Sequence, residues 1–464
     1  MKFDYDLIVI GAGPGGESAA LNAAKHELRA AIVDNGEFVG GGCTHKGTIP
    51  SKALRAAVST FMNFSNNPLV NARSHAYTVT YPELLQNISD VVNRQVAMRS
   101  RFYSRNQVTV YNGNAHFLDR HSIAVQYNDG SQQTLRARHF IIATGARPYR
   151  PPEIDFSHPR VYDSDTILQM QHTPHKILIY GAGVIGCEYA SIFSNMGIKV
   201  DLINTRERLL EFLDDEISDA LGYHLMEKGV IVRHREEFRQ LETSDRHVTL
   251  HTRSGKRIMA DAMLWCNGRT GNTAGLGLEN IGLAPNSREQ LDVDENYRTA
   301  AENIYAVGDV IGWPSLASAA YNQGTSAAAT ICGVEIYQHV DDVPTGIYTL
   351  PEISSVGKTE RELTDAHIPY EVGRAFFKDT ARGQISGQHE GMLKILFHID
   401  TYELLGIHCF GAEATEIIHI GQAILKQPAP GNDIRYFVNN TFNYPTMAEA
   451  YRIAALNGLN RLGV

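Results

Sequence analysis

Two glycine-rich segments carry the residues whose types and spacing are best suited to chemistry. The pattern Gly-x-Gly-x-x-Gly occurs at residues 11–16 and again at residues 181–186, each time between a short apolar run and a helix-like pattern. The first glycine of such a motif permits a tight turn, the second lets the backbone approach a pyrophosphate, and the third lets helix and strand pack closely. The pyrophosphate is held at the helix N-terminus, where free N–H groups favour an anion. The predicted dinucleotide-binding glycines are Gly11, Gly13, Gly16, Gly181, Gly183 and Gly186.

The residue that ends the second strand of each unit indicates which ribose the unit prefers. Asp34 and Asn204 stand at the same offset, about 20 residues after the first glycine of their units. A carboxylate accepts a hydrogen bond from a free 2′-OH and repels a 2′-phosphate, whereas a neutral amide can bond to either. Arg206 and Arg208 are either phosphate ligands or solvated loop cations. The first unit is therefore expected to bind FAD, and the second to accept both NAD and NADP.

A third segment, residues 40–52, carries one cysteine in a frame that resembles a redox motif. It reads GGGCTHKGTIPSK, which resembles the Gly-Gly-x-Cys-x-x-x-x-Cys-x-Pro-x-Lys run of the class-I pyridine nucleotide-disulfide oxidoreductase family. In that family the two cysteines form the disulfide that takes electrons from FAD. Here Cys43 is present, but Thr48 stands in place of the second cysteine. A threonine cannot form a disulfide, so the resemblance implies that electrons reaching a flavin leave by another route.

The C-terminal part of the chain departs from the family at a second position. Relatives carry His-Pro-Thr-x-x-Glu, whose histidine is the acid and base of the thiol chemistry and whose glutamate orients it. Residues 444–449 read YPTMAE, so Glu449 is kept while Tyr444 replaces the histidine. A phenol ionises only well above neutral pH and is a poor proton shuttle there. Both parts of the dithiol machinery are thus missing together.

Other segments resemble the family's cofactor motifs. Gly145 ends a run that resembles the crossover from the FAD domain to the NAD domain, and Gly268 lies in the return. Asp309 ends a strand that resembles the second FAD motif, which presents an aspartate to the ribityl chain. Lys52 and Glu188 match a lysine and a glutamate that pair beside the flavin in relatives. The remaining residues assigned to the cofactor sites are Asn35, Gly36, Gly41, Gly42, Cys43, Thr44, Ala115 and Thr205.

The resemblance also implies roles for these side chains. Lys52 is expected to stabilise negative charge on the flavin ring, with Glu188 holding it as a partly buried ion pair. The alternative is that Lys52 and Glu188 form a surface ion pair that contributes little to stability. Cys43 belongs to the FAD site either as a contact under the flavin or as an inert packing residue. Tyr444 is expected to approach the flavin from a neighbouring subunit.

A member of this family without dithiol chemistry resembles its transhydrogenases. The implied reaction is a reversible ping-pong exchange, in which NADPH passes hydride to FAD and NAD+ then accepts it in the same place. Two alternatives stay open. One is an NAD(P)H oxidase or diaphorase, although Asn204 with Arg206 argues against a site for a single coenzyme. The other is a non-catalytic redox sensor, for which no added domain or basic arm is visible.

The composition limits the partners and the location. The chain has 464 residues and a net charge of −9, which argues against nucleic acid and anionic membranes as partners. No apolar run approaches the roughly 20 residues of a membrane span, and no secretory signal is expected. The five cysteines are scattered and none has zinc-ligand spacing with a histidine, so neither a disulfide framework nor a metal site is predicted. A cytoplasmic location follows.

The elements that must position these residues form an α/β protein. We expect two Rossmann-like nucleotide-binding domains, the FAD domain (1–148 and 271–342) interrupted by the NAD(P) domain (149–270). Residues 343–464 resemble the family's α+β dimerisation domain, so a homodimer or a higher homo-oligomer is expected. Within the C-terminal domain, the alternation of apolar residues predicts strands at 393–398 and 404–409, followed by a helix over 414–426. A small-residue helix is predicted over 315–331 and is expected to pack on the FAD domain.

Overall fold

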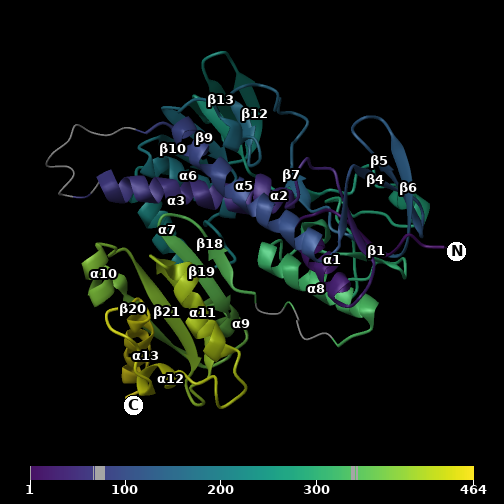
Figure 1. The fold of residues 1–464 in the computed structure, drawn as a ribbon. Helices are drawn as coiled ribbons and strands as arrows, with labels where there is room; N and C mark the ends of the chain where they lie inside the picture. The colour runs from purple at the N-terminus through teal and green to yellow at the C-terminus, as the bar shows by residue number, and fades with distance from the viewer. Residues whose placement is uncertain (1, 66, 68–78, 336–339, 341–342, 464) are drawn as a thin grey trace.

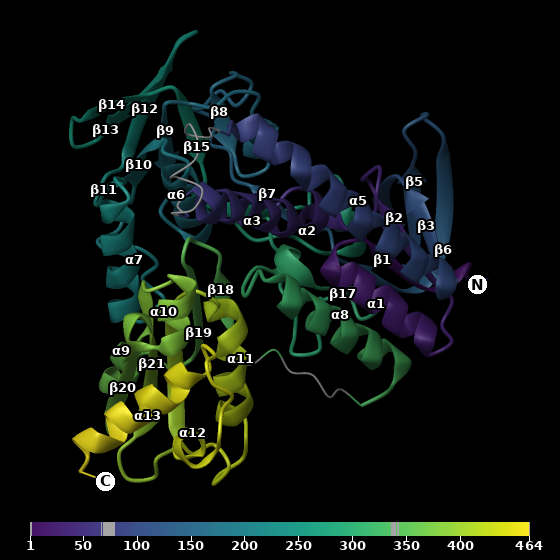
Figure 2. The same cartoon turned by 60° about the vertical axis from the view of Figure 1, so that its left-hand side comes forward.

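The computed structural model describes residues 2–65, 67, 79–335, 340 and 343–463. Figures 1 and 2 show three sheet-containing regions, which are called here the first unit, the second unit and the C-terminal unit. Each unit is defined by its own sheet, and the fold is of the α/β class that the sequence predicts.

The first unit is built on a seven-stranded sheet in which β1 lies between β2 and β6. Strands β3, β2, β1, β6 and β17 run parallel, while β4 and β5 form an antiparallel extension from β6. The central strand β1 is buried along its last four residues, as its apolar run requires. The strands are β1 (Tyr5–Ile10), β2 (Ala30–Asp34), β3 (Thr109–Asn112), β4 (Asn114–Asp119), β5 (Ser122–Gln126), β6 (Gln132–Ile142) and β17 (Ile304–Ala306).

The second unit has a five-stranded parallel sheet, ordered β11-β10-β9-β15-β8, with an antiparallel sheet of three strands beside it. The chain leaves the first unit through β7 and returns to it through β16, and these two strands form a short antiparallel pair. The strands are β7 (Ala146–Pro148), β8 (Val161–Asp163), β9 (Lys176–Tyr180), β10 (Lys199–Ile203), β11 (Ile231–Arg233), β12 (Phe238–Thr243), β13 (Val248–Thr252), β14 (Arg257–Ala260), β15 (Ala262–Trp265) and β16 (Arg269–Gly271).

Helices α1 and α8 are far apart in the sequence but lie side by side in both views, because the chain returns to the first unit after the second (Figures 1 and 2). α1 starts with a proline, whose missing N–H costs nothing at a helix start. Helix α8 begins two residues later than predicted. The helices of the two units are α1 (Pro14–Lys25), α2 (Gly41–His45), α3 (Thr48–Ser65), α5 (Tyr81–Arg105), α6 (Val184–Asn195), α7 (Asp215–Glu227) and α8 (Ala317–Cys332), with short 3₁₀ turns at Ile167–Gln169, Leu278–Ile281 and Gly308–Ile311.

The C-terminal unit is an antiparallel sheet, ordered β18-β19-β22-β21-β20, against which α11 and α13 pack. The predicted strands at 393–398 and 404–409 correspond to β21 and β22, and the predicted helix to α11. The elements are β18 (Thr345–Ile347), β19 (Glu352–Gly357), β20 (Tyr370–Phe376), β21 (Gly391–His398), β22 (Leu404–Gly411), α9 (Glu360–Asp365), a 3₁₀ turn (Phe377–Asp379), α10 (Ala381–Ser386), α11 (Ala414–Leu425), α12 (Tyr436–Asn439) and α13 (Glu449–Arg461). Every helix of the described residues is too short or too polar to cross a membrane.

Candidate active site

A cleft of about 2060 Å³ opens between the first unit, helix α6 and the C-terminal unit. This volume exceeds the roughly 300–1,000 Å³ of an ordinary small-molecule site, and it suits a long dinucleotide with a second ligand against it. Most of the residues predicted for the first nucleotide line the cleft. They are Gly11, Gly13, Asp34, Asn35, Gly36, Gly41, Gly42, Cys43, Lys52, Ala115, Gly145 and Asp309, together with Glu188 from α6.

The glycines of the first motif divide into two groups by what surrounds them. Gly11 has φ of +109°, and a side chain there would overlap the carbonyl of Ala143. A side chain at Gly16 would overlap the carbonyl of Gly11, so these two positions serve the close packing of β1, β6 and α1. Gly13 faces the backbone of Gly41, where an added Cβ on Gly41 would lie 2.7 Å from the Gly13 Cα. The bare N-terminus of α1 therefore borders the cleft, as a phosphate site requires.

The second motif repeats this arrangement in the second unit. Gly181 has φ of +107° beside the carbonyl of Cys266, and a side chain on Gly186 would overlap the carbonyl of Gly181. Gly183 has no described atom within 4 Å of an added Cβ, so its face is open at the N-terminus of α6. Gly268, with φ of +104°, lies in the returning crossover. The donor set fits a second pyrophosphate at this helix.

Asp34 ends β2 and shapes the loop after the first motif. Its carboxylate accepts hydrogen bonds from the backbone N–H of Ala12 at 2.5 Å and of Gly36 at 2.7 Å. The side chain is partly exposed toward the cleft. Its position at the carboxyl end of a central parallel strand is the place where this fold holds a ribose hydroxyl.

Lys52 and Glu188 form the most enclosed charged contact of the cleft. The Lys52 ammonium lies 2.8 and 2.7 Å from the two oxygens of Glu188, with side chains 26% and 6% exposed. This burial distinguishes the pair from a surface ion pair, because the carboxylate is almost fully withdrawn from water. The pair brings α3 of the first unit against α6 of the second.

Tyr348 is a member of this cluster that residue-by-residue assignment missed. Its backbone N–H donates to the Glu188 carboxylate at 2.9 Å, and its ring lies 4.9 Å from the Lys52 ammonium. Such a cation–π contact fixes the direction of a lysine. Tyr348 lies at the start of the segment, residues 343–464, that resembles the dimerisation domain, but that resemblance does not reveal which side chain the tyrosine covers.

Cys43 lies in α2 beside the position that holds the second cysteine in relatives. Burial raises the pKa of the Cys43 thiol, and a hydrogen bond with Thr48 only partly opposes this shift. A thiol with a raised pKa is a weak nucleophile at neutral pH. All five cysteines of the chain are free. The neighbouring residue Thr44 is buried and does not line the cleft.

Asp309 enters the cleft from the turn after β17. Burial raises the pKa of its carboxyl, and Arg269 acts in the opposite direction. Gly145 lines the same cleft and its position is open, with φ of +71° and no described atom within 4 Å of an added Cβ. The cleft thus offers a carboxyl group from the turn after β17 and a clear space at the crossover after β6, which fits a polyhydroxyl chain.

Asn204 is more enclosed than the prediction required. It is 4% exposed, and its amide donates to the carbonyl of Arg208 at 2.8 Å and lies 3.1 Å from His234 Nδ1. Its oxygen accepts from the backbone N–H of Arg206 at 3.2 Å. Asn204 therefore organises the loop after β10, and its role in reading a ribose stays a prediction, as does that of Thr205.

Tyr444 and Glu449 are not brought to the cleft in the single chain. They lie just before and at the start of α13, which packs on β20. Tyr444 is 66% exposed, and one carboxylate oxygen of Glu449 is buried without a hydrogen bond from the described residues. An exposed aromatic ring and an unsatisfied buried oxygen in one segment indicate a surface that lacks its partner.

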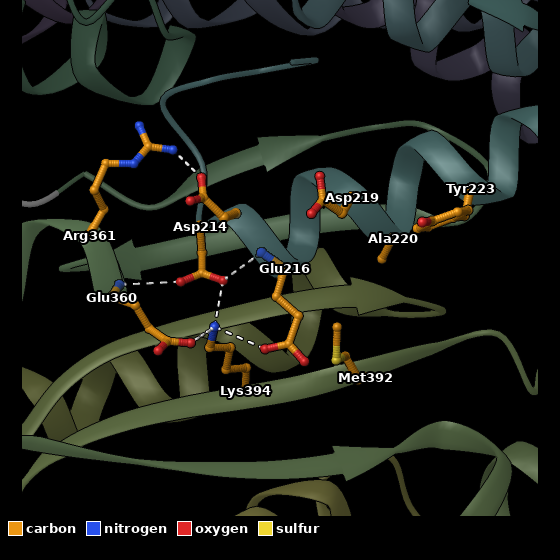
Figure 3. Close-up of a pocket in the computed structure, with 10 residues that line it drawn as sticks. Asp214, Glu216, Asp219, Ala220, Tyr223, Glu360, Arg361, Met392 and Lys394 are labelled. Carbon is orange, nitrogen blue, oxygen red and sulfur yellow. Dashed lines mark hydrogen bonds and ion pairs between the residues drawn. The ribbon is translucent and has the colours of Figure 1, made fainter. Parts of the chain in front are cut away.

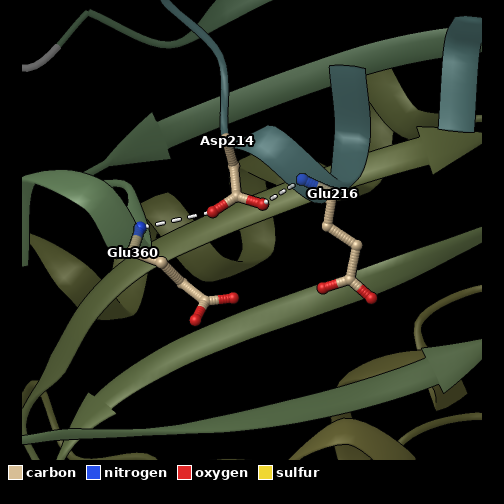
Figure 4. A group of neighbouring side chains, drawn as sticks. All are labelled: Asp214, Glu216 and Glu360. Carbon is tan, nitrogen blue, oxygen red and sulfur yellow. Dashed lines mark hydrogen bonds between the residues drawn. The ribbon is translucent and has the colours of Figure 1, made fainter. Parts of the chain in front are cut away.

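A second cavity, of about 520 Å³, lies between α7 and the C-terminal unit (Figure 3). Asp214, Glu216 and Glu360 converge there in a geometry that resembles a metal site (Figure 4). The ammonium of Lys394, 1% exposed, already lies between them, 2.7 Å from Asp214, 3.0 Å from Glu216 and in contact with Glu360. Burial alone would raise the pKa of Asp214, but His408 and Lys394 outweigh it and hold that pKa below its usual range. This Lys394 cluster joins the second unit to the C-terminal unit.

Comparison with known proteins gives a consistent result. Residues 5–324 match the family model described as pyridine nucleotide-disulphide oxidoreductase, and residues 343–455 match its dimerisation domain. Two relatives, each named soluble pyridine nucleotide transhydrogenase, come from Marinobacter nauticus (60% identity) and Pseudomonas aeruginosa (59% identity), and the matches cover 99% of both chains.

Solved structures give the same fold. The HOCl-induced flavoprotein disulfide reductase RclA from Escherichia coli, as a Cu(II) complex, has a TM-score of 0.88 at 25% identity, covering 98% of this chain and 99% of that one. LpdA from Mycobacterium tuberculosis has a TM-score of 0.89 at 24% identity, covering 97% and 98%.

Proposed function

The chain belongs to the pyridine nucleotide-disulphide oxidoreductase family, and we propose that within it the protein is an FAD-dependent enzyme that exchanges hydride between NADP(H) and NAD(H). One observation carries the choice within the family. Thr48, which hydrogen-bonds to the Cys43 thiol, stands where a second cysteine would have to lie, and the cysteines of the chain are all free. Relatives at 59–60% identity over 99% of the chain carry the name of a transhydrogenase.

The residues of the cleft support this reaction. FAD, when bound, supplies the group that accepts a hydride from one coenzyme and returns it to the other, so that the two coenzymes use one position in turn. The bare N-termini of α1 and α6 provide sites for two pyrophosphates, with Asp34 at the first ribose and Asn204, Thr205 and Arg206 at the second.

Lys52 is the residue that acts on charge at the reacting end of the cleft. A preorganised ammonium stabilises negative charge as it develops, and it is more effective where water is excluded. Glu188 and the ring of Tyr348 hold Lys52 in one direction. Both act as positioning residues, and neither transfers a proton in the proposed reaction.

The connections of the sheets support a division of the chain into three domains. We assign residues 1–148 and 271–342 to the FAD domain, residues 149–270 to the NAD(P) domain and residues 343–464 to the dimerisation domain. The return of β17 to the sheet of β1 and the pairing of β7 with β16 support these boundaries.

A homodimer is the simplest assembly that completes the site. The C-terminal unit matches a dimerisation domain, and we propose that Tyr444 and Glu449 approach the cleft of a second copy. The five free cysteines support a reducing, cytoplasmic location.

The test separates hydride exchange from electron transfer to oxygen. The purified FAD-loaded protein is supplied with NADPH, first alone in air and then with NAD+ without oxygen. The proposal expects slow oxygen uptake in the first case and continuous NADH formation in the second. Rapid oxygen uptake in the first case, with no NADH formed in the second, would show an oxidase instead.

A further inference from the structure

Two loops meet at the carboxyl ends of β10 and β11, where the second nucleotide is expected to present its ribose. Three backbone hydrogen bonds join them: Asn204 N–H to the Arg233 carbonyl at 2.8 Å, Glu236 N–H to the Asn204 carbonyl at 3.1 Å, and Arg235 N–H to the Arg206 carbonyl at 3.2 Å. Arg206 and Arg235 are therefore neighbours on one rigid scaffold, although they are distant in the sequence.

Each of these arginines forms an ion pair with a carboxylate. Arg206 pairs with Glu211 at 3.2 Å, with side chains 67% and 35% exposed, and Arg235 pairs with Glu207 at 2.6 Å, with side chains 71% and 70% exposed. Exposed pairs of this kind contribute little to stability because water competes for both charges. Arg206 and Arg235 can therefore exchange these carboxylates for another anion with little loss of stability.

A third arginine of the same loop is held differently. Arg208 pairs with Asp215 at 2.8 Å, and Asp215 also contacts Arg361 of the C-terminal unit. These side chains are also partly exposed, but Asp215 is shared between two guanidinium groups from two units. This difference separates Arg208 from the two exchangeable arginines.

We propose that Arg206 and Arg235 form an exchangeable phosphate site that gives the second nucleotide site its dual specificity. When a 2′-phosphorylated coenzyme binds, the two guanidinium groups leave Glu211 and Glu207 and bind the phosphate. When the coenzyme carries a free 2′-OH, both arginines keep their carboxylates. This inference rests on the proposed function and names the residues through which one site accepts both coenzymes.

The physical basis is a difference in partner strength. A guanidinium binds a phosphate dianion by charge-assisted, bidentate hydrogen bonds, which are stronger than an exposed pair with one carboxylate. Without a phosphate, unpaired arginines near the ribose would favour anions and disfavour a neutral 2′-OH. Glu207 and Glu211 neutralise these guanidinium groups when the coenzyme has a free 2′-OH. When the coenzyme has a 2′-phosphate, the phosphate neutralises them instead.

The first experiment measures dissociation constants of NADP+ and NAD+ for the FAD-loaded protein by calorimetry. Arg235→Gln is expected to raise the Kd of NADP+ about fivefold to tenfold and to leave that of NAD+ within about twofold. Glu207→Gln is expected to lower the Kd of NADP+ about twofold to fivefold, because the phosphate no longer competes with a carboxylate. Arg435→Gln, which breaks an exposed pair with Asp433 in the C-terminal unit, is the matched control and should change neither.

A double-mutant cycle separates partner exchange from a general effect of negative charge. If Glu207 acts by occupying Arg235, Glu207→Gln has no effect on NADP+ binding in the Arg235→Gln background. An equal effect in both backgrounds, or equal effects on both coenzymes, would overturn the inference.

The outcome also distinguishes this inference from the proposed function. NADP+ that binds and exchanges hydride in all variants with unchanged constants would reject the exchangeable site and leave the function standing. No binding of NADP+ to the unmodified FAD-loaded protein would reject both. Binding of 2′-AMP, which has the phosphate but no nicotinamide, should follow the pattern of NADP+ in every variant.

Discussion

Among single residues, the proposed hydride exchange depends most on a lysine held in one direction. Glu188 and Tyr348 constrain the Lys52 ammonium from two sides, and both contacts are partly or fully removed from water. The charge of Lys52 is therefore part of a preorganised environment, which is the condition under which one charge changes a rate strongly.

Replacing Lys52 with Met tests this role. The substitution removes the ammonium and strands the buried carboxylate of Glu188, so we expect hydride transfer to slow about 100-fold with little change in KM. The rate at which NADPH bleaches the flavin in a stopped-flow instrument measures the effect. Lys25→Met, at an exposed site in α1, is the control, and equal slowing in both variants would contradict the role of Lys52.

The sequence predicted some of these side chains and missed others for a physical reason. The Lys52–Glu188 pair followed from a family resemblance, and its burial came only from the packing of α3 on α6. Asn204 was predicted from its offset alone, but its amide partners, Arg208 and His234, come from the loop after β10 and the turn after β11. Contacts of this kind depend on tertiary register, which a single sequence does not contain.

At the level of helices and strands, the three glycines of each strand–turn–helix motif have the separate roles that the sequence predicted. The outer glycines permit close packing, and the middle glycine leaves a free face toward the ligand. This division was predictable because each position is constrained locally by one turn. The return of β17 to the first sheet was expected only from a resemblance, since a three-residue strand has too little pattern to identify its partner.

Two alanine substitutions in the second motif separate packing from binding. Gly186→Ala forces a methyl group against the Gly181 carbonyl, and we expect it to destabilise the protein by about 1–3 kcal/mol. Gly183→Ala meets open space at a φ of −77°, so we expect an unchanged melting temperature and a nucleotide affinity reduced at least tenfold. Thermal unfolding without nucleotide and NADPH titration give the two readouts. Equal destabilisation by both variants would refute the division.

At the scale of the whole molecule, the units are joined by charge as well as by apolar packing. The Lys394 cluster links α7 of the second unit to the sheet of the C-terminal unit (Figure 3). A buried ammonium among three carboxylates is stable only as a set, because removing one partner strands the others. No sequence motif marks it, since its members come from three separate segments.

Lys394→Met is expected to change the dependence of stability on pH. In the unmodified protein the pKa of Asp214 is lowered below 3.8, so its contribution is present above about pH 4 and is lost as the pH falls through the folded value. In the variant, loss of the ammonium raises the pKa of the Asp214 and Glu216 carboxyl groups from their lowered values, while His408 and Arg374 still act against burial. The variant's free energy of unfolding is expected to be about 3–5 kcal/mol lower than that of the unmodified protein at pH 7. This difference should therefore shrink toward pH 4.

Urea unfolding between pH 4 and pH 8 measures both curves. Lys358→Met, at an exposed position of the same unit, is the control and should run parallel to the unmodified protein. If the difference in free energy of unfolding between Lys394→Met and the unmodified protein stays constant with pH, the cluster stabilises the protein through packing and not through its charges.

The proposed enzyme passes hydride from one coenzyme to the other through a single flavin site without a dithiol. The most direct measurement follows the reduction of thio-NAD+ by NADPH at the wavelength of the reduced analogue, with purified FAD-loaded protein and without oxygen or added disulfide. We expect steady formation of the reduced analogue, with parallel lines in double-reciprocal plots because the two coenzymes use the site in turn. A flavin that NADPH bleaches while no reduced analogue forms would contradict it.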